Sequence, residues 1–259
     1  MLAILSPAKT LDYESPVPDL PLTTPAFVKQ SQALVGLLRD LSVPDVAQLM
    51  DISDTLAALN VARFAEWSPR FTARNSRAAV LAFRGDVYEG MQAWSFTPDD
   101  HVFAQRHLRI LSGLYGLLRP LDRLQPYRLE MGTALANPAG RNLYAFWGNT
   151  IAQALNKALA EQGDDVLVNL ASDEYSKAAL TKVLAARVVT PQFREEKDGK
   201  FKMVSFYAKR ARGLMAGYMV RNRVAVPEAL KDFSAEGYAF NRKLSTPDTL
   251  VFTRRMPVK

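Results

Sequence analysis

The fold hypothesis starts from residues 105–132, QRHLRILSGLYGLLRPLDRLQPYRLEMG. The centre of this stretch, residues 111–116, has the pattern apolar-x-Gly-apolar-x-Gly. Upstream, residues 97–100 (TPDD) begin a predicted helix, because they supply a capping side chain, a first-turn proline and two first-turn acids. Glycines permit a tight turn and let backbone amides approach a phosphate closely. The pattern therefore predicts a helix-hairpin-helix element that holds a nucleic-acid backbone.

Arginines flank the predicted hairpin on both sides. The same stretch contains two acidic residues, Asp122 and Glu130, which can offset part of the arginine charge. From this region we expect phosphate contacts from Arg109, Ser112, Gly113, Leu114, Tyr115, Gly116, Arg119 and Arg128. A plainer interpretation stays open, in which a glycine-rich turn joins two helices and the arginines face solvent.

Length and composition narrow the class of protein. A chain of 259 residues with 48% apolar residues fits one globular domain, spanning 1–259, without a linker. No apolar run approaches the roughly 20 residues needed to cross a bilayer, and the first residues lack the basic region of a signal peptide. We therefore expect a cytoplasmic protein with no membrane partner. The net charge of +7 favours an anionic partner.

The pattern of apolar runs predicts an α/β fold, with a mixed α+β arrangement as the alternative. Short buried strands are expected at 2–5, 78–83, 166–170 and 250–253, and a hairpin at 187–206 around Asp198-Gly199. Helices are expected at 24–39 and 143–160, with an extended proline-rich segment at 14–25 between the first strand and the first helix. Residues 56–60 form a second, weaker candidate hairpin, because alanine and asparagine replace its two glycines.

Polar residues follow two of the predicted strands and form a candidate cleft. Ser6 and Lys9 come after the first strand, although the glycines of a phosphate loop are missing there. Lys9 is therefore expected to meet an anion only as a single charge. After strand 166–170 the chain carries further cleft candidates, namely Asp173, Glu174, Tyr175 and Lys177. Loops at the ends of buried strands face the open edge of an α/β sheet, where sites form.

A basic helix follows the hairpin. Lys209, Arg210 and Arg212 lie on the face opposite its apolar stripe, with Gly213 and Gly217 beside them. Two glycines on such a face indicate that a bulky anion or another backbone approaches closely. The alternative for these three charges is a solvated face.

Known catalytic and metal patterns are missing from the sequence. His101 and His107 point about 240° apart on a helix, so they form no chelating pair. No Glu-x-x-His occurs, which argues against a di-iron site. Asp173 and Glu174 are the remaining candidates for magnesium. We expect no cofactor, no metal site and no catalytic residue.

Several separate motifs resemble the YaaA family and span the chain in order. They are SPAKTL at 6–11, LSGLYG at 111–116, RPL at 119–121, QPYRLEMG at 125–132, NLASDEY at 169–175, SFYAKRARG at 205–213 and EGY at 236–238. This resemblance implies a bacterial cytoplasmic protein of the hydrogen-peroxide stress response that limits damage to DNA and proteins and lowers unincorporated iron. It also implies a single-domain fold peculiar to the family, with a positively charged cleft and a helix-hairpin-helix that bind DNA.

The sequence thus favours a protein that binds double-stranded or branched DNA without catalytic turnover. Phosphate contacts are expected from the hairpin and from Lys209, Arg210 and Arg212, which would position DNA without reading its sequence. The alternative is a metal-dependent enzyme that acts on DNA or a nucleotide through Asp173 and Glu174. Direct iron storage is a third, weaker interpretation, because the chain offers few ligands.

Overall fold

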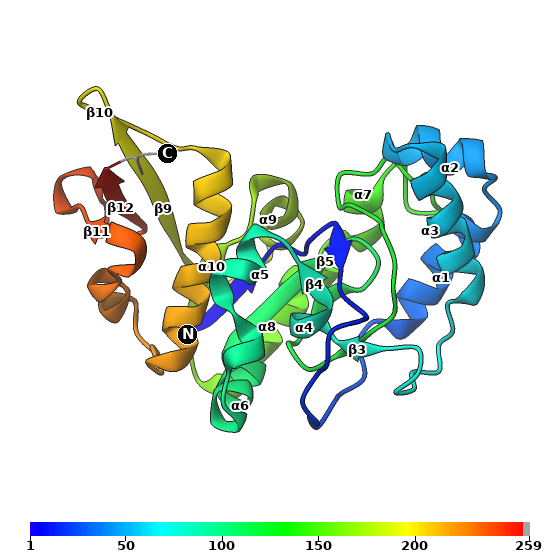
Figure 1. Ribbon diagram of the computed structural model, residues 1–259, viewed down its shortest axis with the longest axis horizontal. Helices are drawn as coiled ribbons and strands as arrows, with labels where there is room; N and C mark the ends of the chain where they lie inside the picture. Colours follow the sequence, from blue (N-terminus) through cyan, green and yellow to red (C-terminus); the bar gives the residue numbers. More distant parts are fainter. Residues whose placement is uncertain (256–259) are drawn as a thin grey trace.

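The computed structural model describes residues 1–255 and places a mixed eight-stranded sheet at the centre of the chain (Figure 1). The strand order is β11-β12-β9-β8-β1-β5-β6, and β10 pairs with β9. The strands are β1 Leu2–Leu5, β5 Leu108–Ser112, β6 Gly116–Leu118, β8 Val166–Leu170, β9 Arg187–Lys197, β10 Lys200–Lys202, β11 Ala239–Phe240 and β12 Thr249–Arg255. Two small sheets pair β2 Thr10–Leu11 with β4 Phe83–Arg84, and β3 Arg77–Ala78 with β7 Arg123–Leu124.

The middle of the sheet is parallel. Strand β1 pairs in parallel with β5 on one side and with β8 on the other, and β8, β9 and β12 continue the parallel order. All four residues of β1 are buried, as expected for a parallel strand covered on both faces. The register aligns Leu5 with Ile110 and with Leu170. The carboxyl ends of β1 and β8 therefore meet at one edge of the sheet.

Helices flank this sheet and extend beyond it at one end. They are α1 Val28–Arg39, α2 Val43–Met50, α3 Asp54–Glu66, α4 Ala79–Ala82, α5 Asp86–Met91, α6 Pro98–His107, α7 Leu143–Trp147, α8 Thr150–Gln162, α9 Asp173–Ala179 and α10 Ser205–Arg221. Helix α10 contacts both α5 and α6, and α8 contacts α9. Helices α1 to α3 lie at one end of the molecule, and β9 to β12 lie at the other (Figure 1).

The predicted α/β fold is confirmed, and so are several of its elements. Strands β1 and β8 have the expected positions. Thr97 caps α6 through the backbone amide of Asp100, and the side chain of Asp100 accepts the Thr97 amide in return. The hairpin around Asp198-Gly199 also forms, although its second strand ends at Lys202 and α10 begins at Ser205.

The helix-hairpin-helix predicted at residues 111–116 is wrong. These residues form a strand–turn–strand, in which Ser112 of β5 is paired with Gly116 of β6 in an antiparallel ladder. Every residue from 110 to 118 is buried. The Trp147 indole donates to the Gly113 carbonyl at 2.9 Å, and a Cβ on Gly113 would lie 2.2 Å from the Leu129 carbonyl oxygen. The turn is therefore part of the core, and its amides have no access to a phosphate.

Three other predicted elements differ from the structure. Ala58 and Asn60 lie inside the continuous helix α3, so no turn occurs at 56–60; the turn between α2 and α3 lies at residues 51–53. The strand predicted at 78–83 is interrupted by α4. The helix predicted at 143–160 is divided into α7 and α8, because Gly148 adopts φ +46° at the end of α7.

The glycines beside the basic face serve close packing of two helices. A Cβ on Gly213 would lie 1.7 Å from the Val87 carbonyl oxygen, and one on Gly217 would lie 2.8 Å from that of Met91. Gly90 of α5 makes the reciprocal approach to the Arg210 carbonyl oxygen. Another backbone, and not a bulky anion, therefore occupies this space.

Within residues 1–255 no helix combines the length and apolar character needed to cross a bilayer.

Gly116 offers a test of this core turn. Gly116→Ala would place a methyl group 2.6 Å from the Trp147 ring at φ +67°, whereas Gly163→Ala meets nothing within 4 Å at the similar φ of +66°. The left-handed backbone alone costs about 1–2 kcal/mol, and overpacking adds about 1–3 kcal/mol. We expect urea denaturation to show Gly116→Ala as the less stable of the two by at least about 1 kcal/mol. Equal losses would mean that Gly116 has room around it.

Candidate functional site

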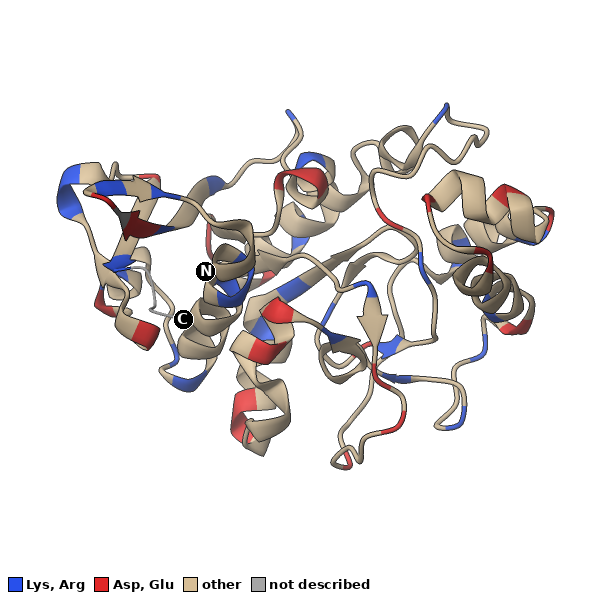
Figure 2. Cartoon of the chain, turned by 45° about the horizontal axis from the view of Figure 1, so that its top comes forward, with Lys and Arg blue, Asp and Glu red and all other residues tan. Residues whose placement is uncertain are grey.

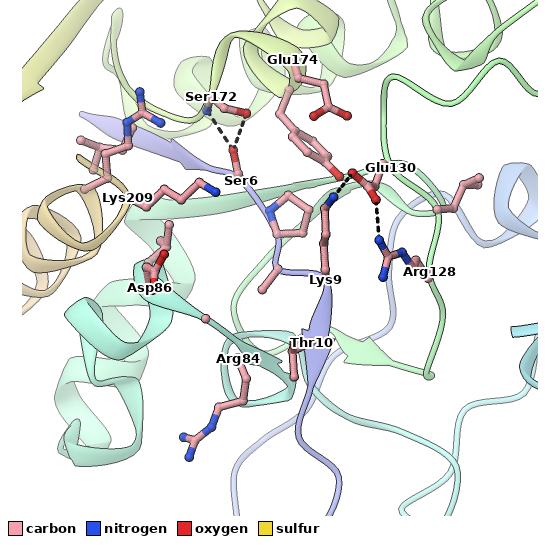
Figure 3. A pocket seen from close by; sticks show the side chains of 18 of the residues that line it. Ser6, Lys9, Thr10, Arg84, Asp86, Arg128, Glu130, Ser172, Glu174 and Lys209 are labelled. Carbon is pink, nitrogen blue, oxygen red and sulfur yellow. Dashed lines mark hydrogen bonds and ion pairs between the residues drawn. The ribbon is translucent and has the colours of Figure 1, made fainter. Parts of the chain in front are cut away.

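A cavity of about 650 Å³ opens at the edge where β1 and β8 end (Figure 3). In the sheet, β1 lies between β5 and β8. Both strands come later in the chain than β1 and pair on opposite sides of it. In parallel α/β sheets, ligands bind outside the carboxyl ends of the strands where the strand order reverses in this way. The cavity is lined by residues 6–10 after β1, residues 84–87 around the start of α5, residues 127–130, residues 170 and 172–175 at the end of β8, and Lys209 and Arg212 of α10.

Ser6 and Ser172 connect the ends of the two strands. The Ser6 hydroxyl accepts a hydrogen bond from the Ser172 amide at 2.9 Å and donates to the Ser172 hydroxyl at 3.2 Å. The Tyr88 hydroxyl donates to the Ser6 carbonyl at 3.0 Å. These bonds fix the floor of the cavity and leave the two serine side chains at its surface.

Lys9 and Arg128 share one carboxylate. Glu130 contacts the Lys9 ammonium at 2.9 Å and the Arg128 guanidinium at 3.1 Å, and both pairs are drawn in Figure 3. The Lys9 side chain is 62% exposed, so its ion pair is largely screened by water. Both cations lie in the predicted cleft, but Glu130 offsets part of their charge.

Of the cations that line the cavity, Lys209 and Arg212 are the two with no carboxylate partner among the described residues. Three residues apart on α10, they share one face of the helix and both line the cavity. Among the described residues, neither makes an ion pair within 4 Å. Burial lowers the pKa of the Arg212 guanidinium, and the nearby charge of Asp173 opposes this shift. An anion entering the cavity would supply the counter-charge that these two groups lack.

The acidic residues after β8 line the same cavity. Asp173 and Glu174 begin α9, and Glu174 is held by the Gly132 amide, which donates to its carboxylate at 2.8 Å. Burial raises the pKa of the Tyr175 hydroxyl, which keeps it protonated. The described part of the chain contains no group of three His, Asp or Glu side chains that could hold a metal ion. Asp173 and Glu174 line the cavity, where their carboxylates can accept hydrogen bonds from a ligand.

Nine predicted site residues lie outside the cavity, namely four charged side chains and the five hairpin residues 112–116. Arg109 donates to the carbonyls of Gln105 and Leu108 at 3.0 and 2.7 Å, and burial lowers its pKa to about 10. Arg119 pairs with Asp122 at 3.0 Å, and Arg210 pairs with Glu236 at 2.7 Å. Lys177 lies over the Tyr144 ring, 4.8 Å from its centroid. The hairpin residues 112–116 are buried in the core. Each of these groups already has a structural partner.

The expected positive cleft is a cavity of mixed charge. Five basic and four acidic side chains line it, and basic and acidic residues are interspersed along the whole chain (Figure 2). Arg84 and Asp86 were missed as site residues. They follow a predicted strand, as Ser6 and Asp173 do, so the same signal applies to them. Arg84 points away from Ser6 (Figure 3) and lies 3.4 Å from Glu89 and 3.6 Å from Asp12.

Glu130→Gln tests how far this carboxylate offsets the local charge. The change releases Lys9 and Arg128, so we expect later elution from a heparin column with little loss of stability, because a partly exposed ion pair contributes about 0–1 kcal/mol. Glu161→Gln is the matched control, because it removes the same charge from an exposed pair on α8. Equal elution shifts for the two variants would show that only net charge matters.

The sequence is similar to that of known proteins of one family. Residues 1–244 match the family model described as peroxide stress protein YaaA. A relative from Tolumonas auensis, described as a UPF0246 protein, is 59% identical over 254 residues, which is 98% of both chains. The resemblance seen in the sequence motifs is therefore confirmed, and the chain belongs to the YaaA family of peroxide stress proteins.

Proposed function

We propose that this protein acts in the peroxide stress response as a cytoplasmic DNA-binding protein without catalytic turnover. In this role it protects DNA and proteins and lowers unincorporated iron. Membership of the YaaA peroxide stress family supports the stress role. The iron effect is carried over from the family resemblance, and we assign no residue to it.

The observation that carries the DNA-binding proposal is the pair formed by Lys209 and Arg212. Both lie on one face of α10 at an open cavity, and both lack a carboxylate partner within the described residues. Phosphate groups are the ligands that such cations most often neutralise in nucleic-acid complexes. Lys9 and Arg128 add two further cations at the same cavity. The DNA contact therefore moves from the hairpin at 111–116 to the cavity and its rim.

Phosphate contacts make two features of binding predictable. They carry no sequence information, so we propose binding that tolerates any duplex sequence and branched structures as well. They also release counterions, so affinity falls with salt at a log–log slope of about −0.9 for each phosphate neutralised. Fluorescence anisotropy of labelled duplexes at several salt concentrations measures both. A flat salt dependence, or a strong preference for one sequence, would contradict the proposal.

A double variant tests the two cations. Lys209→Gln with Arg212→Gln should weaken DNA binding at least tenfold, about 1.4 kcal/mol, and reduce the salt slope by up to about 2. Arg210 is left intact, because its pairing with Glu236 gives it a structural role. Arg106→Gln with Lys157→Gln is the matched control: both side chains are exposed, at the end of α6 and on α8, and net charge changes equally. Equal affinities of the two double variants would remove Lys209 and Arg212 from the interface.

An enzyme acting on DNA or a nucleotide is the second candidate. The observation in its favour is that Asp173 and Glu174 line the same cavity as the cations. Incubation of duplex and branched DNA with the protein and magnesium or manganese separates the two functions. An intact, shifted band supports binding alone. Cleaved or modified products that disappear in Asp173→Asn would support the enzyme.

A further inference from the structure

We infer that the cavity at the ends of β1 and β8 receives a single nucleotide, phosphate and base together, that has left the stack of a DNA duplex. This inference rests on the proposed DNA binding and specifies the part of the DNA that enters the site. It follows from the size of the cavity, from its mixed charge and from an aromatic side chain on the same face of α10.

The cavity is too small for a double helix. A cube of 650 Å³ has an edge of about 9 Å, whereas the major groove of a duplex alone is about 12 Å wide. The volume instead falls in the range of about 300–1,000 Å³ that is typical of sites for small molecules. Arg212 lines the cavity and is only partly exposed, so it belongs to the cavity wall. A phosphate that reaches Arg212 must therefore belong to a nucleotide that projects from the duplex.

The charges of the cavity match both parts of a nucleotide. Lys209 and Arg212 supply unpaired cations for a phosphate. Asp173 and Glu174 supply acceptors, and carboxylates accept hydrogen bonds from the exocyclic amino groups of bases. Ser6 adds a hydroxyl at the floor. A site for phosphate backbone alone would need no acids, because carboxylates repel phosphates. The mixture is expected where a base edge is also recognised.

An exposed aromatic ring precedes the cations on α10. Phe206 is 58% exposed and lies three residues before Lys209, so the two share a helix face. Exposed aromatic rings beside cationic grooves stack with bases in proteins that bind unpaired nucleic acid. Phe206 is placed to cover a base that remains next to the extruded nucleotide. Its exposure has no structural explanation among the contacts of the core.

Selectivity for unpaired nucleotides follows from the free-energy cost of moving a nucleotide out of the duplex. Unstacking and unpairing oppose entry of the nucleotide, and this cost is smallest for a base that is already mismatched or unpaired. The protein should therefore bind a duplex with one unpaired nucleotide at least tenfold more tightly than the fully paired duplex. The preference should not depend on the flanking sequence.

The test uses the full-length protein and duplexes that carry 2-aminopurine, whose fluorescence rises when it leaves the stack. One duplex pairs 2-aminopurine with thymine, and another places it opposite an abasic site. We expect a severalfold rise in fluorescence on binding and the tenfold preference for the second duplex. Binding of both duplexes with equal affinity and no rise would overturn the inference while leaving the proposed DNA binding intact. No binding of either duplex would overturn the proposed function as well.

Two controls locate the nucleotide and its source. Ala8→Phe places a ring in the cavity wall, and Phe206→Ala removes the exposed ring without touching the core. We expect each to abolish the preference for the unpaired nucleotide while binding of the paired duplex persists; preserved preference in a folded Phe206→Ala and a folded Ala8→Phe would contradict the inference. Titration with deoxyadenosine monophosphate tests the free source. Weak binding, at least tenfold below that of the abasic duplex, supports extrusion from DNA, and tighter binding would assign the cavity to free nucleotides instead.

Discussion

The two parallel ladders of β1, one with β5 and one with β8, determine where the candidate site lies. Strand β1 is fully buried, and its register aligns its last residue, Leu5, with Ile110 of β5 and with Leu170 at the end of β8. Ser6 and Ser172 consequently emerge at the same edge and bond to each other. Helix α10 is held close to α5 by glycines at the contact, and this contact brings Lys209 and Arg212 to the same edge. Five separate segments of the chain thus contribute to one cavity at this edge.

The strands that form this edge could be predicted from the sequence, whereas the central hairpin could not. Runs such as Leu2–Leu5 and Val166–Leu170 are short, apolar and followed by polar residues, which is sufficient to predict buried strands with a site beyond them. Residues 108–118 are also apolar, but a short apolar run fits a buried strand and a buried helix equally well. The spacing of their glycines predicts a phosphate contact. In the structure, Trp147 covers Gly116 and bonds to the Gly113 carbonyl, and this partner lies about 30 residues away in sequence.

Four of the predicted cations line the cavity, and the other four, Arg109, Arg119, Lys177 and Arg210, lie outside it. Lys9, Arg128, Lys209 and Arg212 line the cavity, as do Ser6, Asp173, Glu174 and Tyr175. Arg210 and Arg254 instead contact Glu236, and Arg254 is buried in β12. Glu236 and Arg210 are 26 residues apart in sequence, and no local sequence pattern predicts such an ion pair. Helical spacing can place a residue on a face, but the ion-pair partner depends on tertiary structure.

The central claim is that DNA occupies the cavity where β1 and β8 end. Since the chain contains no cysteine, single cysteines can report on each surface separately. Thr10→Cys lies exposed at the rim of the cavity, and Ala160→Cys lies exposed near the end of α8, shortly before β8 begins at the opposite edge. The rate of reaction with a thiol reagent, measured with and without saturating DNA, tests the claim most directly. The account predicts at least tenfold protection of Cys at position 10 and none at position 160, and equal rates with and without DNA at position 10 would contradict it.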